Sequence, residues 1–241
     1  ALERWLEKEI TDDDLRRGIE IVNKNRRLMK KVYNLRREPN PKLTGLEAMY
    51  MVVSSQLTDK NEHSDAIEEM FNNGLATRDL GRESSIRLMT VGSENDDVEF
   101  TKMVEETLGA TIVIEDHCTG SRYFWEEVKL DEKDPLTAIA ERYVTRTPCP
   151  QRDWSPERIR FKRIVQFIEE FAVQGVLLIQ QKFCDPHELD ISALRDLLNE
   201  KGIKNYFLEF DVTVPAGQFR IRVEAFLETF ASDELFAEDV L

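Results

Sequence analysis

The chain has 241 residues, with 33 Lys and Arg against 47 Asp and Glu, so its formal net charge is −14 and its sequence pI is about 4.8. With 41% hydrophobic residues it has enough apolar material for a folded core, which excludes wholesale disorder. Its acidity argues against binding to nucleic-acid phosphates, and no apolar run approaches the ~20 residues of a membrane span. We therefore expect neither nucleic acid nor a membrane as a partner.

The use of cysteine and the start of the chain bear on where the protein works. Three cysteines, an odd number at long spacings, indicate a reducing compartment rather than a disulfide framework. No basic segment followed by an apolar one opens the chain, so we expect no secretory signal and a cytoplasmic protein. The sequence begins at Ala1 within a helical pattern, which is typical of a processed chain or of a fragment without its N-terminal part.

Residues 1–84 are predicted to form a mainly helical segment. Thr11 with Asp14, and Thr44 with Glu47, have the spacing of capping boxes that open helices. The first helix is predicted to end at the prolines near residue 40, and the stretch after the second is polar and loosely helical.

Residues 85–241 alternate between short apolar runs and helical patterns. The predicted strands are Ile86–Val91, Thr111–Ile114, Val176–Ile179 and Tyr206–Phe210. The predicted helices run from Asp96 to Leu108 with Ser93 as a cap, from Pro135 to Val144, from Ser155 to Val173, from a capping Asp190 to Gly202, and from Gly217 to Phe230. Apolar strands separated by helices indicate an α/β fold, a Rossmann-like parallel sheet of about four strands with flanking helices, preceded by the helical segment.

Polar, titratable and thiol residues collect just after the predicted strands, where sheets of this kind bind ligands. His117 and Cys118 follow the second strand, and Cys184 and His187 follow the third. Thiolates at one sheet edge suggest a soft metal or an iron–sulfur cluster. Two other interpretations stay open: each cysteine is a small buried hydrophobic residue, or these four side chains form a Cys₂His₂ zinc site.

Two further features are weaker signals. Arg122, beside Gly120 and Ser121, is suited to hold a phosphate or carboxylate, although a surface ion pair explains it equally well. Cys149 lies between two prolines, and we favour a structural role for it over a ligand role.

Several motifs together resemble the family of 2-hydroxyacyl-CoA dehydratase and benzoyl-CoA reductase subunits. They are Asp116 to Arg122, Thr147-Pro148-Cys149-Pro150, Gln181 to Glu188, Gly202 to Asp211 and Gly217 to Phe226, so the resemblance covers residues from about 86 to 230. The segment Phe-Cys-Asp-Pro-His-Glu at 183–188, with the Phe-Leu-Glu-Phe-Asp stretch after it, is more similar to the benzoyl-CoA reductase branch.

The resemblance implies an enzyme of two related subunits with cysteine-held [4Fe–4S] clusters. A separate ATP-hydrolysing iron–sulfur activator supplies a low-potential electron, which reduces an acyl-CoA thioester to a ketyl-type radical anion. In the reductases the aromatic ring is then dearomatised; in the dehydratases the radical loses water. Two alternatives to the reductase stay open: a 2-hydroxyacyl-CoA dehydratase subunit, and a non-catalytic partner subunit of such a complex.

The resemblance also assigns roles to residues. The C-terminal cluster ligand of the family falls on Cys184, and we take Cys118 as a second thiolate at the same edge. The remaining ligands are implied to lie in an N-terminal domain that precedes this sequence. Thr119, Gly120, Ser121 and Arg122 are expected to position the cofactor or the acyl group. His187 is a candidate proton donor, with a hydrogen-bonded structural histidine as the alternative.

Overall fold

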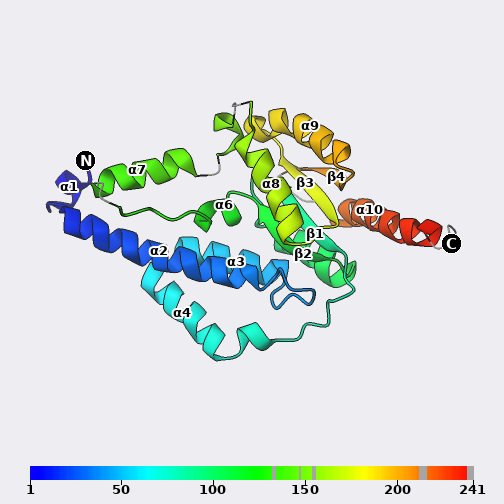
Figure 1. Cartoon of the computed structure of the whole chain (residues 1–241), viewed down its shortest axis with the longest axis horizontal. Coiled ribbons are helices and arrows are strands. Elements are labelled where there is room, and N and C mark those ends of the chain that lie inside the picture. The colour runs from blue at the N-terminus through cyan, green and yellow to red at the C-terminus, as the bar shows by residue number, and fades with distance from the viewer. Residues whose placement is uncertain (132–133, 147, 154–155, 212–215, 238–241) are drawn as a thin grey trace.

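The computed structural model describes residues 1–131, 134–146, 148–153, 156–211 and 216–237. Four parallel strands form one sheet in the order β2-β1-β3-β4 (Figure 1). They are β1 (Arg87–Gly92), β2 (Thr111–Asp116), β3 (Gly175–Gln181) and β4 (Lys204–Phe210). The predicted α/β fold with a four-stranded parallel sheet is confirmed. β1 is shifted by one residue from its predicted range, and the other three strands are longer than predicted.

Helices dominate the chain before the sheet. They are α1 (Leu2–Leu6), α2 (Asp12–Asn34), α3 (Gly45–Leu57), α4 (Lys60–Asn72) and the 3₁₀ turn η1 (Leu75–Thr77). Both predicted capping boxes are present: the side chains of Thr11 and Thr44 accept the backbone N–H of Asp14 and Glu47, whose carboxylates accept in return.

The later helices connect or follow the strands. They are α5 (Val98–Lys102), the π-helical turn η2 (Met103–Thr107), α6 (Ser121–Phe124), α7 (Pro135–Thr145), the 3₁₀ turn η3 (Pro150–Arg152), α8 (Ile159–Glu170), α9 (Asp185–Glu200) and α10 (Ala216–Ala237). No helix within the described residues combines the length and apolar character needed to cross a bilayer.

The two faces of the sheet bury different side chains. On β3, Val176 and Leu178 join a core cluster with residues of α2, α3, α8 and α9, whereas Leu177 and Ile179 join a second cluster with residues of α5 and α10. This alternation follows from the two-residue period of a strand. The first cluster unites buried residues from before and after residue 85, so the helices α2 and α3 pack into the core of the sheet.

The strand order defines where a ligand site belongs. The chain passes from β1 outward to β2 on one side, and from β3 outward to β4 on the other, so the connections diverge at the β1–β3 pair. Sheets of this type bind ligands beyond the carboxyl ends of the strands at such a point. The carboxyl ends of β1 and β3, near Gly92 and Gln181, mark that position.

The long helix predicted from Ser155 starts later than the sequence pattern suggests. It begins at Ile159 as α8, while Ser155 itself, like Thr147 of the quoted motif, lies outside the described residues. Asp153 provides the cap, because its carboxylate accepts the backbone N–H groups of Ile159 and Arg160 at 2.8 and 2.9 Å. The prediction of a start at the Ser-Pro pair was therefore wrong.

Two other predicted caps are also wrong. Asp190 lies inside α9, because this helix already begins at Asp185 with Pro186 in its first turn. Ser93 does not cap α5; the side chain of Asp97 performs this role. In both cases a residue that suits a helix start stands close to the true one.

A buried carboxylate joins the N-terminus of α3 to the sheet. Glu105, in the π-helical turn η2, is 2% exposed and accepts the backbone N–H groups of Gly45, Leu46 and Ile112 at 2.7, 2.9 and 3.0 Å. Burial raises the pKa of Glu105, although the three N–H groups act against that shift. One side chain thus accepts hydrogen bonds from two elements, α3 and β2.

We expect Glu105→Ala to lower the free energy of unfolding by about 3 kcal/mol, because it leaves buried N–H groups without an acceptor. Its exposed neighbour provides the control: Glu106→Ala should change stability by less than about 0.5 kcal/mol. Urea denaturation followed by circular dichroism measures both variants. Equal stability of the two variants would show that the carboxylate does not join α3 to β2.

Candidate functional site

The carboxyl ends of β1, β2 and β3 meet at one edge of the sheet. β2 ends at Asp116 and leads into His117 and Cys118, while β3 leads into Cys184 and His187. Because the strands are parallel, the fold delivers these segments to the same edge, as the sequence predicted. Their side-chain contacts then decide what the edge can do.

Asp116 is completely buried and is held by two arginines. Its Oδ2 accepts a hydrogen bond from Arg160 Nε at 2.7 Å, and its Oδ1 lies 3.4 Å from Arg122 Nε. Arg160 Nη1 also donates to Asp190 Oδ2 at 2.7 Å, and Arg158 pairs with the other Asp190 oxygen. Because buried charges are tolerated only when paired, these residues form one ion network that ties β2, α6, α8 and α9 together.

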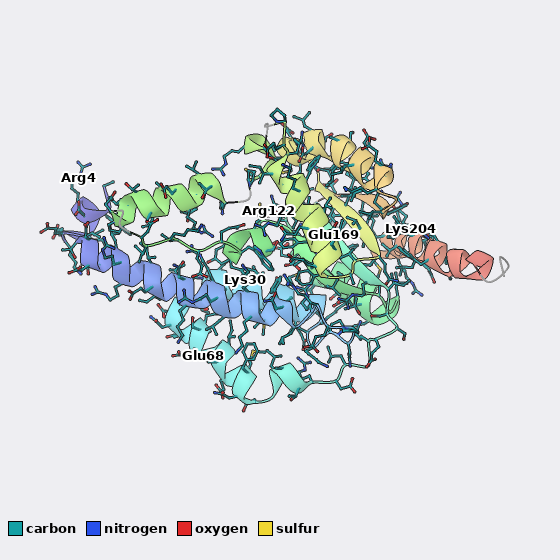
Figure 2. All side chains as sticks on the ribbon, viewed as in Figure 1. Arg4, Lys30, Glu68, Arg122, Glu169 and Lys204 are labelled. Atoms are coloured by element: carbon teal, nitrogen blue, oxygen red, sulfur yellow. The ribbon has the colours of Figure 1, made fainter. Side chains whose placement is uncertain are left out.

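Arg122 extends this network across the ends of the strands and lies in the middle of the molecule (Figure 2). Its Nη2 donates to the carbonyl oxygens of Gly92, Ser93 and Asp116, the latter two at 3.2 Å. Its side chain is 7% exposed, so the surface ion pair left open by the sequence is wrong. The guanidinium lies where the strand connections diverge, between β1 and β3. Most of its hydrogen bonds go to backbone carbonyl oxygens.

His187, in the first turn of α9, accepts a hydrogen bond from this arginine. Arg122 Nη1 lies 3.3 Å from His187 Nε2, and since a guanidinium only donates, Nε2 must be unprotonated and the proton must sit on Nδ1. Burial, with the nearby charges of Arg160 and Arg122, lowers the pKa of His187 to about 3. The imidazole is therefore neutral at pH 7.

His117 is also buried and neutral. Its Nε2 lies 3.0 Å from the hydroxyl of Thr90, and burial lowers its pKa to about 3, with Arg122 as the next cause. A cavity of about 20 Å³ beside the side chains of Thr90 and His117 has room for about one water molecule.

The segment after Cys118 is bound closely to the chain. Thr119 Oγ1 accepts the backbone N–H of Asn95 and donates to its carbonyl oxygen, both at 3.2 Å. Ser121 donates to the carbonyl oxygen of Glu115 at 2.5 Å. Gly120 is pressed against the same glutamate, because a Cβ at this position would stand 2.7 Å from Glu115 Cγ. These contacts fix the turn that carries Cys118 and Arg122.

The three cysteines are reduced thiols in different environments. Cys184 is half-buried in the N-cap position of α9, where no side-chain hydrogen bond occupies its sulfur. The amide of Gln180 donates to its carbonyl oxygen at 3.1 Å and holds the backbone of this turn. Cys118 is exposed, and Cys149 is half-buried in the loop before η3.

The Cys₂His₂ zinc site is not formed. Across the ranges that the structure describes, which include His117, Cys118, Cys184 and His187, no group of three or more His, Cys, Asp or Glu side chains is placed to hold a metal ion. The two histidines are instead engaged with Thr90 and Arg122.

The ion network centred on Arg160 and Asp190 was not predicted from the sequence, which indicated only a capping role for Asp190. A signal for both was present. Arg160 precedes Ile164 and Phe167 at the spacing of the apolar face of α8, and Asp190 precedes Leu194 in the same way on α9. A charged residue in register with an apolar stripe is expected to be buried and paired.

Comparison with known proteins gives consistent matches along the chain. A family model described as "2-hydroxyglutaryl-CoA dehydratase, D-component" matches residues 1–230. The (R)-phenyllactyl-CoA dehydratase beta subunit of Clostridium sporogenes is 28% identical over 95% of this chain and 60% of its own length.

Two further relatives carry different activities in their names. A benzoyl-CoA reductase subunit of Thauera aromatica is 24% identical over 93% of this chain and 58% of its own length. The (R)-2-hydroxyglutaryl-CoA dehydratase subunit beta of Acidaminococcus fermentans is 24% identical over 95% of this chain and 60% of its own length. The chain thus spans about three-fifths of the length of these relatives.

Removal of the charge on Asp116 tests the ion network. Burial alone would raise the pKa of Asp116, but Arg122 and Arg160 lower it below the usual range, so the carboxylate is charged and its stabilising effect is lost only as the pH falls through this lowered pKa. We expect Asp116→Asn to lower the free energy of unfolding by about 3–5 kcal/mol, because two buried arginines lose a partner. The exposed Asp185→Asn is the control, and equal denaturation midpoints for the two variants would contradict the network.

The neutral state of His187 predicts a pH dependence of stability. Because its pKa is about 3 in the folded chain and about 6.5 when unfolded, protons bind preferentially to the unfolded chain between these values, and stability falls as the pH falls. Between pH 7 and pH 5 the loss from this residue should be about 2 kcal/mol. His187→Gln should remove that part of the slope, whereas the exposed Glu188→Gln should retain it. An unchanged slope in His187→Gln would mean that the ring is charged in the fold.

Proposed function

Because the chain belongs to the 2-hydroxyglutaryl-CoA dehydratase D-component family, we propose that it is a subunit of an enzyme complex that acts on an acyl-CoA thioester. The match of the family model to residues 1–230 carries this proposal. The relatives named above support it, since each is named as a subunit of a CoA-thioester dehydratase or reductase and covers more than 90% of this chain.

The reaction we propose is one-electron reduction of the thioester carbonyl to a ketyl-type radical anion. Two outcomes follow for such a radical. When the acyl group carries a 2-hydroxyl, the radical expels it as hydroxide, loses a proton from the neighbouring carbon and returns its extra electron to the donor, which leaves the enoyl-CoA. When the acyl group is aromatic, the radical accepts further electrons and protons. The first outcome is supported by the dehydratase relatives and the second by the reductase relative, which the motif at 183–188 also resembles.

A test with both substrate types separates these outcomes. The full-length protein, purified without oxygen together with its sibling subunit and an ATP-hydrolysing activator, is supplied with benzoyl-CoA and with (R)-2-hydroxyacyl-CoA thioesters. A dienoyl-CoA product assigns the reductase reaction, and an enoyl-CoA product assigns the dehydratase reaction. Absence of both products from a complex with intact iron–sulfur clusters would favour a non-catalytic partner subunit.

The residues at the sheet edge fit a cluster only in part. A cubane held entirely by protein takes four thiolates, and the described residues gather no such set. What they offer is Cys184, whose sulfur is free at the positive end of the α9 dipole, and Cys118 on the turn after β2. We propose that these thiolates contribute to a [4Fe–4S] cluster whose other ligands lie outside this sequence. When bound, the cluster would supply the low-potential electron.

The other residues of the edge act as positioning groups in this proposal. Arg122 and the turn Thr119-Gly120-Ser121 hold the backbone beside Cys118 in place. We propose that backbone N–H groups of this turn orient the acyl group or the cofactor. His187 is proposed to donate through Nδ1, because Arg122 occupies Nε2. A neutral imidazole N–H of this kind polarises a carbonyl without transferring charge to it. The reducing conditions of the cytoplasm suit free thiols at such a site.

Replacement of Cys184 tests the ligand proposal. Cys184→Ala should leave the fold intact, because the side chain is only half-buried, and should reduce iron and sulfide in the anaerobic complex by at least one cluster equivalent. Cys149→Ala is the matched control, since this thiol is also half-buried and we assign it a structural role. Iron content measured by plasma spectrometry, with turnover, decides the outcome. Full iron content and turnover in Cys184→Ala would reject the assignment.

A further inference from the structure

A cavity of about 430 Å³ lies between α2 and α7, and none of its lining residues belongs to the ion network. These helices run beside each other on the side of the molecule opposite α10 (Figure 1). Apolar side chains of both helices line it, among them Ile19, Val22 and Ile139. Its volume is within the range of small-molecule binding sites.

The polar lining of this cavity is strongly basic, although the whole chain carries a net charge of −14. Its cations are Arg26, Lys60, Arg142 and Arg146. We call this space the cation pocket. In a protein with such an excess of carboxylates, cations could be paired easily, so a group of them around one cavity calls for a physical reason.

None of these four cations forms an ion pair with a carboxylate within 4 Å in the described part of the chain. Arg26 donates to the side-chain oxygen of Asn23 at 2.9 Å, and Arg142 donates to the carbonyl oxygens of Tyr123 and Glu126, both at 2.9 Å. Lys60 contacts the hydroxyl of Tyr123 at 2.7 Å. These partners are neutral, so they satisfy donors without neutralising charge.

The like charges also destabilise one another. Burial lowers the pKa of Arg26 to about 10, and the charge of Arg142 is the next cause. Burial also lowers the pKa of Arg142, with the charge of Arg146 next. Asp14, the carboxylate that lines the cavity, is already engaged by Thr11 and Arg17. An external anion would relieve this repulsion.

We propose that the cation pocket binds the phosphate groups of a nucleotide-bearing ligand, with the apolar lining taking its uncharged part; resting on the proposed function, we identify that ligand as the acyl-CoA. Coenzyme A combines phosphates with adenine and an uncharged pantetheine arm, which matches a cavity lined by both cationic and aliphatic side chains. Guanidinium groups bind phosphate by paired, charge-assisted hydrogen bonds. The pocket reaches Tyr123, the residue after Arg122, so it adjoins the turn that follows β2.

Two arginines allow a test without disrupting the backbone. Arg26 and Arg146 make no hydrogen bond to a main-chain carbonyl through their side chains in the described structure, whereas Arg142 does. We expect Arg26→Gln and Arg146→Gln each to weaken binding of coenzyme A about tenfold in the full-length complex, equivalent to about 1.4 kcal/mol. Arg26→Lys, which keeps the charge but not the paired donors, should lose less affinity than Arg26→Gln. Arg222→Gln, at an exposed position on α10, should remain within twofold of the wild type.

Isothermal titration with five probes identifies the ligand chemistry. Coenzyme A and adenosine 3′,5′-bisphosphate should lose affinity in both glutamine variants, and pantetheine, which has no phosphate, should not. ATP or inorganic phosphate bound more tightly than coenzyme A at this pocket would overturn the identification as acyl-CoA. Unchanged affinity for every phosphate-bearing probe in both variants would overturn the pocket itself.

Thermal melting separates a binding role from a structural one. Without ligand, Arg26→Gln should raise the melting temperature, because it removes a partly buried like charge; a lowered melting temperature with unchanged binding would mark Arg26 as structural. The proposed function is tested separately. Turnover of acyl-CoA with binding that is insensitive to Arg26 rejects the pocket alone, whereas Arg26-dependent binding in a complex without turnover rejects the proposed reaction alone.

Discussion

The burial of the Asp116 carboxylate between two arginines is the interaction on which the sheet edge depends. Asp116 is the last residue of β2, and its two partners, Arg122 and Arg160, lie on α6 and α8. Arg160 also forms an ion pair with Asp190 on α9. A buried ion that lost its partner would be strongly unfavourable, so each connection is held in place by the others. The edge is built as one unit rather than as separate loops.

This unit determines how the candidate groups are presented. The hydrogen bond from Arg122 fixes the tautomer of His187, three residues beyond Cys184. The same guanidinium binds carbonyl oxygens at the ends of β1 and β2 and closes the point where the strand connections diverge. The thiol of Cys184 remains half-exposed beside this rigid network. This arrangement holds the groups of the edge in a fixed geometry.

Much of the fold could be predicted from local patterns. The strands follow apolar runs, and the two capping boxes follow reciprocal side-chain spacing, which needs no tertiary information. The start of α8 could not be predicted, because Asp153 caps it from outside the helix after a left-handed Arg158. The role of Glu105 could not be predicted either, since two of its three N–H partners lie about 60 residues away in the sequence.

The site was predictable in location but not in chemistry. Parallel strands explain why His117, Cys118, Cys184 and His187 arrive at one edge. The pairing of Arg122 with Asp116 and His187 depends on side-chain directions that spacing does not define. For that reason the sequence left a zinc site open, whereas the structure engages both histidines elsewhere. Charged residues on the apolar stripes of α8 and α9 were the overlooked signal.

We propose that the sulfur of Cys184 is bonded to iron in the assembled complex. The most direct measurement is an anomalous-difference map at the iron absorption edge, from oxygen-free crystals of the full-length protein with its sibling subunit. We predict an iron peak within bonding distance of Cys184 Sγ, at the N-terminus of α9. A map with iron elsewhere in the complex, and with this thiol surrounded only by protein atoms, would contradict the claim.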